Sequence, residues 1–277
     1  MGETVSFWQN WFVWRDAMIV SLVCGAALAY LGVWAMLRKM VYVPLALSQV
    51  SSVGVVLAFF LADLFGVKGA LRVFLDPTGV SFLFAVMAAL FFARAGRGSL
   101  EATAVAYLLA AAAAILLGGF VRADVHDVSD VLFGNAVLVE TWQIAVTAGA
   151  ALIAAVIHAL GYRRFLFASY DPDSAGAAGI KVFRQDVLLF VSMAIMISAA
   201  TRAIGGLPAF AFTVLPALAA LRIGRTMGRT FVLALVAGAL SAGLGYYVSF
   251  ALDLPTGACM TAVAAIFYIA SNLVAQR

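Results

Sequence analysis

The sequence predicts an all-α membrane protein, a polytopic bundle of about nine transmembrane helices. Two observations support this fold class. Hydrophobic residues make up 65% of the chain and charged residues only 11%, whereas soluble domains carry roughly a quarter charged residues. The apolar residues also form long blocks of the length that a spanning helix needs, about 20 residues, and not the short alternating segments of a transmembrane β-barrel. The bilayer is therefore the solvent for most of the 277 residues.

Nine apolar blocks are bounded by polar or charged residues and predict the spanning helices. In chain order they cover residues 16–37, 43–62, 79–93, 101–120, 138–160, 186–203, 207–221, 230–251 and 257–275. Residues 16–277 are thus predicted to form one transmembrane domain, with its main polar loop at residues 163–185.

Residues 1–15 form a separate segment before the first span. The segment lacks the basic start and the small-residue cleavage site of a signal peptide. Trp8, Trp11 and Trp14 recur at helical spacing, which favours an amphipathic helix at the outer membrane interface. A frayed end with unrelated tryptophans is the alternative.

The basic residues predict the orientation. Cytoplasmic loops carry an excess of Lys and Arg. With the N-terminus outside, most of the 17 basic residues lie on the inner side, namely Arg38, Lys39, Arg94, Arg97, Arg163, Arg164, Lys181, Arg184, Arg222, Arg225, Arg229 and Arg277. The outer side then holds Arg15, Lys68, Arg72, Arg122 and Arg202. The opposite orientation would invert this ratio, so we predict that the N-terminus is outside and the C-terminus inside.

Residues 171–179, DPDSAGAAG, predict a short capped helix in the polar loop on the inner side. Asp171 suits the N-cap, Pro172 the first helical position and Asp173 the positive end of the helix dipole. Gly179 suits the left-handed residue that closes such a helix. A short exposed helix of this kind is suited to bind a separate soluble subunit that drives the movements of a membrane pore. A plain connection between two spans is the alternative.

Five separated stretches resemble the integral-membrane subunits of the bacterial zinc, manganese and iron ABC importers. Residues 37–54, LRKMVYVPLALSQVSSVG, resemble the basic turn of that family and a following span with an LSH-type motif. Residues 131–135, VLFGN, are similar to its YLFGD turn, and residues 167–180, FASYDPDSAGAAGI, to its FDPEFARAxGI cytoplasmic helix. Residues 213–220, TVLPALAA, and 252–258, LDLPTGA, resemble its LLVLPAATA segment and its DLPTGP turn.

The resemblance implies a homodimeric permease in the bacterial inner membrane that moves zinc or manganese. Its implied partners are a cytoplasmic ABC ATPase, which binds ATP and Mg, and a substrate-binding protein, with membrane lipid around it and no role for nucleic acid. No Gly-Lys dipeptide and hence no P-loop occurs in the sequence, so we expect neither a cofactor nor enzymatic activity in this chain. The residues implied to dock on the ATPase are Asp171, Pro172, Asp173, Ala175 and Gly179.

The second span departs from the family pattern, which places an Asp and a His four residues apart along the ion path. Leu45 and Gln49 stand at the corresponding positions, and neither is a good ligand for zinc or manganese. One interpretation is a weakly liganded pore for a divalent ion that the binding protein selects. The other is a path for a metal chelate or small polar solute, lined by Gln49 with Ser48, Ser51 and Ser52. Alternatively, the serines serve close helix packing.

Residues 122–130, RADVHDVSD, form an outer loop that is rich in possible metal ligands. Asp124, His126, Asp127 and Asp130 supply oxygen and nitrogen donors dense enough to capture a divalent cation. Their spacing matches no recognised ligand signature, and a solvated acidic loop is the alternative.

The remaining titratable residues bear on a rival function. Glu101, Glu140 and Asp186 lie at predicted span ends, and no carboxylate lies in the middle of a predicted span. An ion-coupled secondary transporter therefore remains an alternative without an obvious coupling residue. His158 lies in an apolar span and is predicted to be hydrogen-bonded within the bundle, not to bind a metal.

Overall fold

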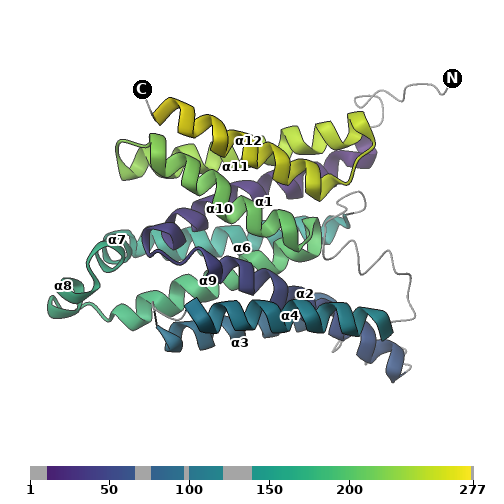
Figure 1. Cartoon of the computed structure of the whole chain (residues 1–277), viewed down its shortest axis with the longest axis horizontal. Coiled ribbons are helices and arrows are strands. Elements are labelled where there is room, and N and C mark those ends of the chain that lie inside the picture. Colours follow the sequence, from purple (N-terminus) through teal and green to yellow (C-terminus); the bar gives the residue numbers. More distant parts are fainter. Residues whose placement is uncertain (1–10, 66–75, 97–99, 121–138, 276–277) are drawn as a thin grey trace.

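The computed structural model describes residues 11–65, 76–96, 100–120 and 139–275. Over these residues nine helices are long and apolar enough to cross a membrane. They are α1 (Trp11–Leu37), α2 (Tyr42–Leu64), α3 (Pro77–Ala95), α4 (Leu100–Phe120), α6 (Thr141–Leu160), α9 (Val182–Ile204), α10 (Gly206–Ile223), α11 (Met227–Leu252) and α12 (Thr256–Ala275). Each matches one predicted span, which confirms the fold class. Two short helices, α7 (Tyr162–Tyr170) and α8 (Pro172–Ala177), project from one end of the bundle (Figure 1).

The N-terminal segment joins α1 without a break where the structure describes it. Helix α1 begins at Trp11, so residues 11–15 are its first turn. Trp14 packs edge-on against Phe250 of α11, with ring centroids 5.2 Å apart. Residues 1–10 lie outside the described residues, and the interfacial helix stays a prediction.

The spanning helices pack in two groups. In the first group, α1 and α12 both pack on α10 and α11. In the second group, α2 and α3 pack with α9, and α4 packs on α2. Helix α9 also contacts α1, α6 and α10, so it lies between the groups (Figure 1). In its most apolar 18-residue stretch 72% of the residues are buried, whereas in that of α4 the share is 17%. Helix α9 is therefore the centre of the bundle, and α4 lies at its periphery.

Glycine permits the closest contacts in the first group. A Cβ atom on Gly25 of α1 would lie 2.4 Å from the carbonyl oxygen of Gly238 of α11, and one on Gly32 would lie 1.7 Å from that of Thr213 of α10. Small residues at such crossings are typical of membrane helices, whose association depends on close packing because lipid offers no hydrophobic driving force. No side chain fits at these positions unless the helices move apart.

Serine hydroxyls join the second group. The Oγ atom of Ser81 of α3 lies 2.7 Å from that of Ser51 of α2 and 2.6 Å from that of Ser198 of α9. All three side chains are fully buried. A chain of hydroxyl groups therefore crosses three helices inside the apolar part of the bundle.

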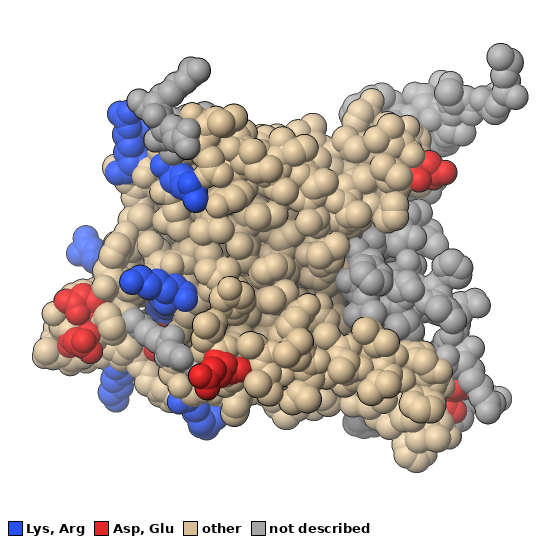
Figure 2. Space-filling view, in the orientation of Figure 1, with Lys and Arg blue, Asp and Glu red and all other residues tan. Residues whose placement is uncertain are grey.

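Charged side chains gather at the two ends of the bundle. On the face shown in Figure 2, the described Lys and Arg residues lie at the end that carries α7 and α8, whereas the opposite end shows only Asp and Glu. Helix α12 also ends on the basic side (Figure 1). This distribution agrees with the predicted orientation, in which the basic end is cytoplasmic.

Candidate functional site

The predicted pathway residues lie in the first half of α2. Ser48, Ser51 and Ser52 are fully buried within the single chain, whereas Leu45 and Gln49 are partly exposed. Leu45 and Gln49 are four residues apart and share one face of the helix. The structure thus leaves at the surface the two positions where the sequence departs from the family pattern.

The buried serines of α2 all have hydrogen-bond partners, two within the helix and one on α3. Ser48 donates to the carbonyl oxygen of Leu45 at 2.9 Å, and Ser52 donates to that of Ser48 at 3.0 Å. Ser51 pairs with Ser81 of the neighbouring helix. The contact of Ser51 favours a packing role for that residue, and a pathway role for Ser48 and Ser52 stays a prediction.

Helix α8 begins with the cap that the sequence predicts. The carboxylate of Asp171 accepts a hydrogen bond from the backbone N–H of Ser174 at 3.0 Å, and Pro172 occupies the first helical position. The side chain of Ser174, and then its backbone N–H, hold the pKa of Asp171 below its ordinary value. Asp173 adds a second negative charge to the first turn, where the helix dipole favours it.

The same helix ends in a Schellman motif. Gly179 adopts the left-handed conformation, with φ 81°. Its N–H donates to the carbonyl oxygen of Gly176, and the N–H of Ile180 donates to that of Ala175, both at 3.0 Å. Ala175 is fully buried, whereas most residues around it are exposed. The helix is therefore anchored by one small side chain and presents its other faces to solvent.

Helix α7 precedes α8 and was not expected from the sequence. Phe165 and Ala168, three residues apart, are buried and form its apolar face. Arg163 and Arg164 are exposed near the start of this short segment. The helical spacing of Phe165 and Ala168 is the feature of the sequence from which α7 could have been predicted.

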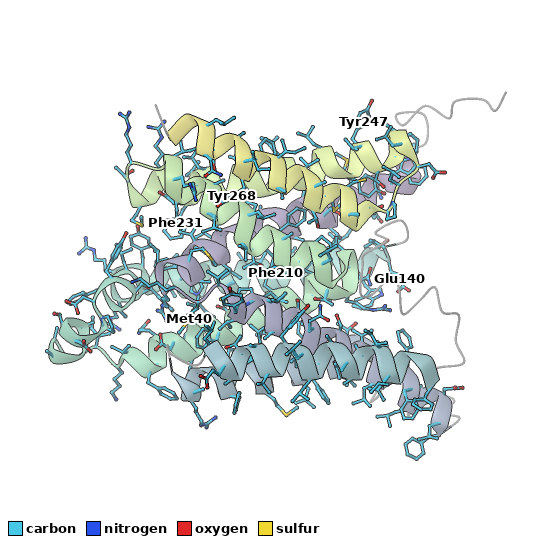
Figure 3. The ribbon with its side chains drawn as sticks, in the orientation of Figure 1. Met40, Glu140, Phe210, Phe231, Tyr247 and Tyr268 are labelled. Carbon is cyan, nitrogen blue, oxygen red and sulfur yellow. The ribbon has the colours of Figure 1, made fainter. Side chains whose placement is uncertain are left out.

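An aromatic cluster anchors α7 to the bundle. The ring of Phe165 lies 4.7 Å from that of His158 of α6 and 5.8 Å from that of Trp34 of α1, between centroids. Phe231 of α11 lies 4.8 Å from Trp34, in the half of the bundle nearer to α7 (Figure 3). The Nε2 atom of His158 lies 3.1 Å from the Oγ atom of Ser192 of α9, which confirms that this histidine is hydrogen-bonded within the bundle.

Two charged residues, which sequence reasoning placed in an inner loop and at a span end, are paired inside the protein. Arg38, just after α1, forms an ion pair with Asp186 of α9 and donates from Nε to the Oγ atom of Ser169 of α7 at 3.0 Å. Arg38 is 4% and Asp186 8% exposed. Sequence reasoning counted Arg38 among the loop charges and missed this contact, because nothing local links residues 148 positions apart.

The predicted metal-capture residues Asp124, His126, Asp127 and Asp130 lie outside the described residues, as does the VLFGN stretch. Within the ranges that the structure describes, no group of three or more His, Cys, Asp or Glu side chains could hold a metal ion. The capture role therefore stays a prediction.

Comparison with known proteins assigns the chain to a family. The model of the ABC 3 transport family matches residues 11–275, nearly the whole sequence. The chain belongs to the ABC 3 transport family. Together with the nine apolar helices, this membership makes it a multi-pass protein of the bacterial inner membrane.

Individual members of the ABC 3 family are similar along most of their length. The manganese transport system membrane protein MntC of Listeria monocytogenes is 27% identical, over 95% of this chain and 91% of its own. The chelated iron transport system membrane protein YfeD of Yersinia pestis is 25% identical, over 92% and 83% respectively. A chain of PsaBC from Streptococcus pneumoniae, solved in complex with Fab, has the same fold, with a TM-score of 0.81 at 22% identity over 97% of this chain and 94% of that one.

Proposed function

We propose that the chain is the permease subunit of an ABC importer for a divalent metal ion, with manganese favoured over zinc. The family match over residues 11–275 carries this proposal, and the name of the relative in Listeria favours manganese. In this proposal two copies of the chain form the pore, a separate ATPase binds ATP and Mg, and a substrate-binding protein delivers the ion.

The loop formed by α7 and α8 is proposed to be the docking point of the ATPase. It lies at the basic end of the bundle, which the positive-inside rule assigns to the cytoplasm (Figure 2). Its helix α8 is capped at both ends and exposed on most faces, and the preceding helix α7 joins the aromatic cluster through Phe165. A displacement of this loop would therefore be transmitted to α1, α6 and α11 through the contacts between aromatic rings.

Leu45 and Gln49 are proposed to line the path between the two copies. They are partly exposed on α2 although they lie in a spanning helix, and an amide that faced lipid would be costly. Neither side chain binds a divalent ion tightly. Weak contacts suit a path whose binding protein selects the ion, because tight binding midway slows release.

A metal chelate is the second candidate cargo, and the same two residues favour it. An alkyl side chain and an amide suit a bulkier ligand-wrapped metal better than a bare cation, which prefers carboxylate, imidazole or thiolate. The relative in Yersinia is named for chelated iron.

A double substitution, Leu45→Asp with Gln49→His, distinguishes the two cargoes. It introduces a carboxylate and an imidazole on one face of α2 and should create a binding site for the ion. For a bare ion we expect slower turnover or a changed metal preference, measured as uptake into liposomes that contain the permease, its ATPase and its binding protein. For a chelate we expect loss of chelate uptake without strong dependence on free metal.

The control is Leu45→Asn with Gln49→Asn, which makes position 45 polar as Leu45→Asp does and leaves position 49 an amide, but adds no carboxylate or imidazole ligand. It should transport nearly as well as the parent. A Leu45→Asp, Gln49→His protein that matches the parent for every substrate would show that these residues do not line the path.

A further inference from the structure

The ion pair of Arg38 and Asp186 lies where three elements meet. Arg38 directly follows the last residue of α1, Asp186 is in the second turn of α9, and Ser169 is in the last turn of α7. The guanidinium of Arg38 reaches both partners and lies 5.8 Å from the ring centroid of Phe165. One buried side chain thus connects the first helix, the central helix and the cytoplasmic loop.

The charges agree with the helices that carry them. A cation is favoured at the C-terminal end of α1 and an anion near the N-terminal end of α9, because of the helix dipoles. The Oγ atom of Ser169 donates to the carbonyl oxygen of Phe165 at 2.6 Å, so its lone pairs face the Nε–H of Arg38. Each contact of the three residues therefore has a matched donor and acceptor.

Stability alone does not account for such a contact. Buried ion pairs are often no more stabilising than apolar residues of the same size, since taking both charges out of water is costly. What the contact does fix is relative position. The N–H donors of a guanidinium lie in one rigid plane, so two acceptors bound to it are held at fixed positions relative to each other. Here the acceptors belong to α7 and α9, and Ser169 lies two residues before Asp171, the N-cap of α8.

We propose that Arg38, Ser169 and Asp186 form the contact through which movement of α8 is passed to α9. The inference rests on the proposed function, in which an ATPase moves α8. In this view they are positioning residues. Because Arg38 holds Ser169 and Asp186 together, α7 and the start of α9 move as one unit. Because α9 contacts helices of both groups, this movement reaches the whole bundle.

Asp186→Asn tests the contact, because it keeps the shape of the side chain and removes its charge. The permease is reconstituted in liposomes with its ATPase and binding protein, and manganese uptake and ATP hydrolysis are measured together. We expect the ATP hydrolysed per ion to rise about fivefold or more, the usual range of coupling between sites, while the ATPase stays bound. A merely structural residue would lower uptake and hydrolysis in equal proportion, and that result would overturn the inference.

Ser169→Ala provides a second variant that leaves both charges in place, and it is decisive if Asp186→Asn does not fold. It should also raise the ATP cost per ion, and Ser169→Thr, which restores a hydroxyl, should return the ratio to that of the parent. A parent-like ratio in Ser169→Ala would contradict the inference.

Arg222→Gln is the matched control. Arg222 also lies at the basic end, where it donates to the hydroxyl of Tyr268 at 3.0 Å and lies over its ring, away from α7. Its ratio should equal that of the parent. If the parent itself shows no ATP-driven metal uptake, the proposed function fails and this inference with it. Normal uptake by the parent with an unchanged ratio in Asp186→Asn would reject the inference alone.

Discussion

The contacts of α1 with α10 and α11 are closed by glycine, whereas those of α3 with α2 and α9 are closed by serine hydroxyls. At Gly25 and Gly32 the backbones of two helices touch, and only one separation of the helices is compatible with that packing. A hydroxyl group can rotate and exchange its donor and acceptor roles. The glycine contacts therefore hold a fixed geometry, and the serine contacts permit small movements without loss of hydrogen bonding.

This difference matters because α9 belongs to the serine-linked group and receives the cytoplasmic loop. Its inner end carries Asp186, and its outer half carries Ser198. Movement that α9 passes to α2 and α3 would therefore meet adaptable contacts. Helices α1, α10 and α11 would move as one body, because their glycine contacts permit no change in their separation.

The largest effect is expected at the glycine contact. Gly32→Val places a branched side chain where a Cβ atom alone would lie 1.7 Å from the carbonyl oxygen of Thr213. We expect a loss of more than about 3 kcal/mol, above the usual range for overpacking, seen as a lower melting temperature and poor monodispersity in detergent. Gly149→Val on α6 is the control, since a Cβ atom there meets nothing within 4 Å. If the two variants were equally stable, the glycine contacts would not hold a fixed geometry, and the contrast with the serine-linked helices would fail.

A smaller effect is expected at the centre of the serine chain. Ser81→Ala removes both hydroxyl contacts and should cost about 1–2 kcal/mol, the usual range for such bonds in membranes, measured by denaturation in detergent. In a double-mutant cycle with Ser198→Ala, the two changes should be non-additive because they share one bond. Ser241→Ala should cost less, because Ser241 donates only to the carbonyl oxygen of Ala237 in its own helix. Additive costs at Ser81 and Ser198 would argue that the hydroxyl chain does not act as a unit.

The smallest effect is expected at the cap of α8. Asp171→Ala should leave the melting temperature unchanged and speed hydrogen exchange at the amide of Ser174, which loses its acceptor. The lowered pKa of Asp171 sets the pH dependence. Because the folded pKa lies below the ordinary value of 3.8, the cap is complete above that value and is lost as the pH falls through the folded pKa.

Asp171→Asn is the control for this titration. Asn also caps helices but has no acidic proton, so protection of the Ser174 amide, corrected for intrinsic exchange, should not vary with pH in this variant. A parent protein whose protection is equally insensitive below pH 3.8 would show that the carboxylate is not the cap.

The helices were predictable because the bilayer imposes their length and apolar composition. The bounds agree at Leu37, where charged residues follow the span, and differ at its other end, where the helix continues through Arg15 and Asp16 to Trp11. The caps of α8 were also predictable, since capping depends on neighbouring residues alone.

Contacts between distant residues could not be predicted in this way. Ser81 and Ser198 are 117 positions apart, and each resembles any small polar residue of a span. Arg38 looked like one more loop charge until the fold placed it against Asp186. The exposure of Gln49 likewise depends on which face of α2 the neighbouring helices leave open, and a single sequence does not contain that information.

Lys39 ends α1 in the left-handed conformation, with φ 60°. The N–H groups of Lys39 and Met40 donate to the carbonyl oxygens of Met36 and Ala35, the same motif that Gly179 completes after α8. Glycine would adopt this conformation at less cost, by about 1–2 kcal/mol. A lysine here also adds a positive charge next to the first span, which during synthesis helps decide which side of the membrane each loop takes. The residue is better suited to the insertion of the nascent chain than to the finished fold, so Lys39→Gly would be expected to stabilise the mature protein and to make its biogenesis less faithful.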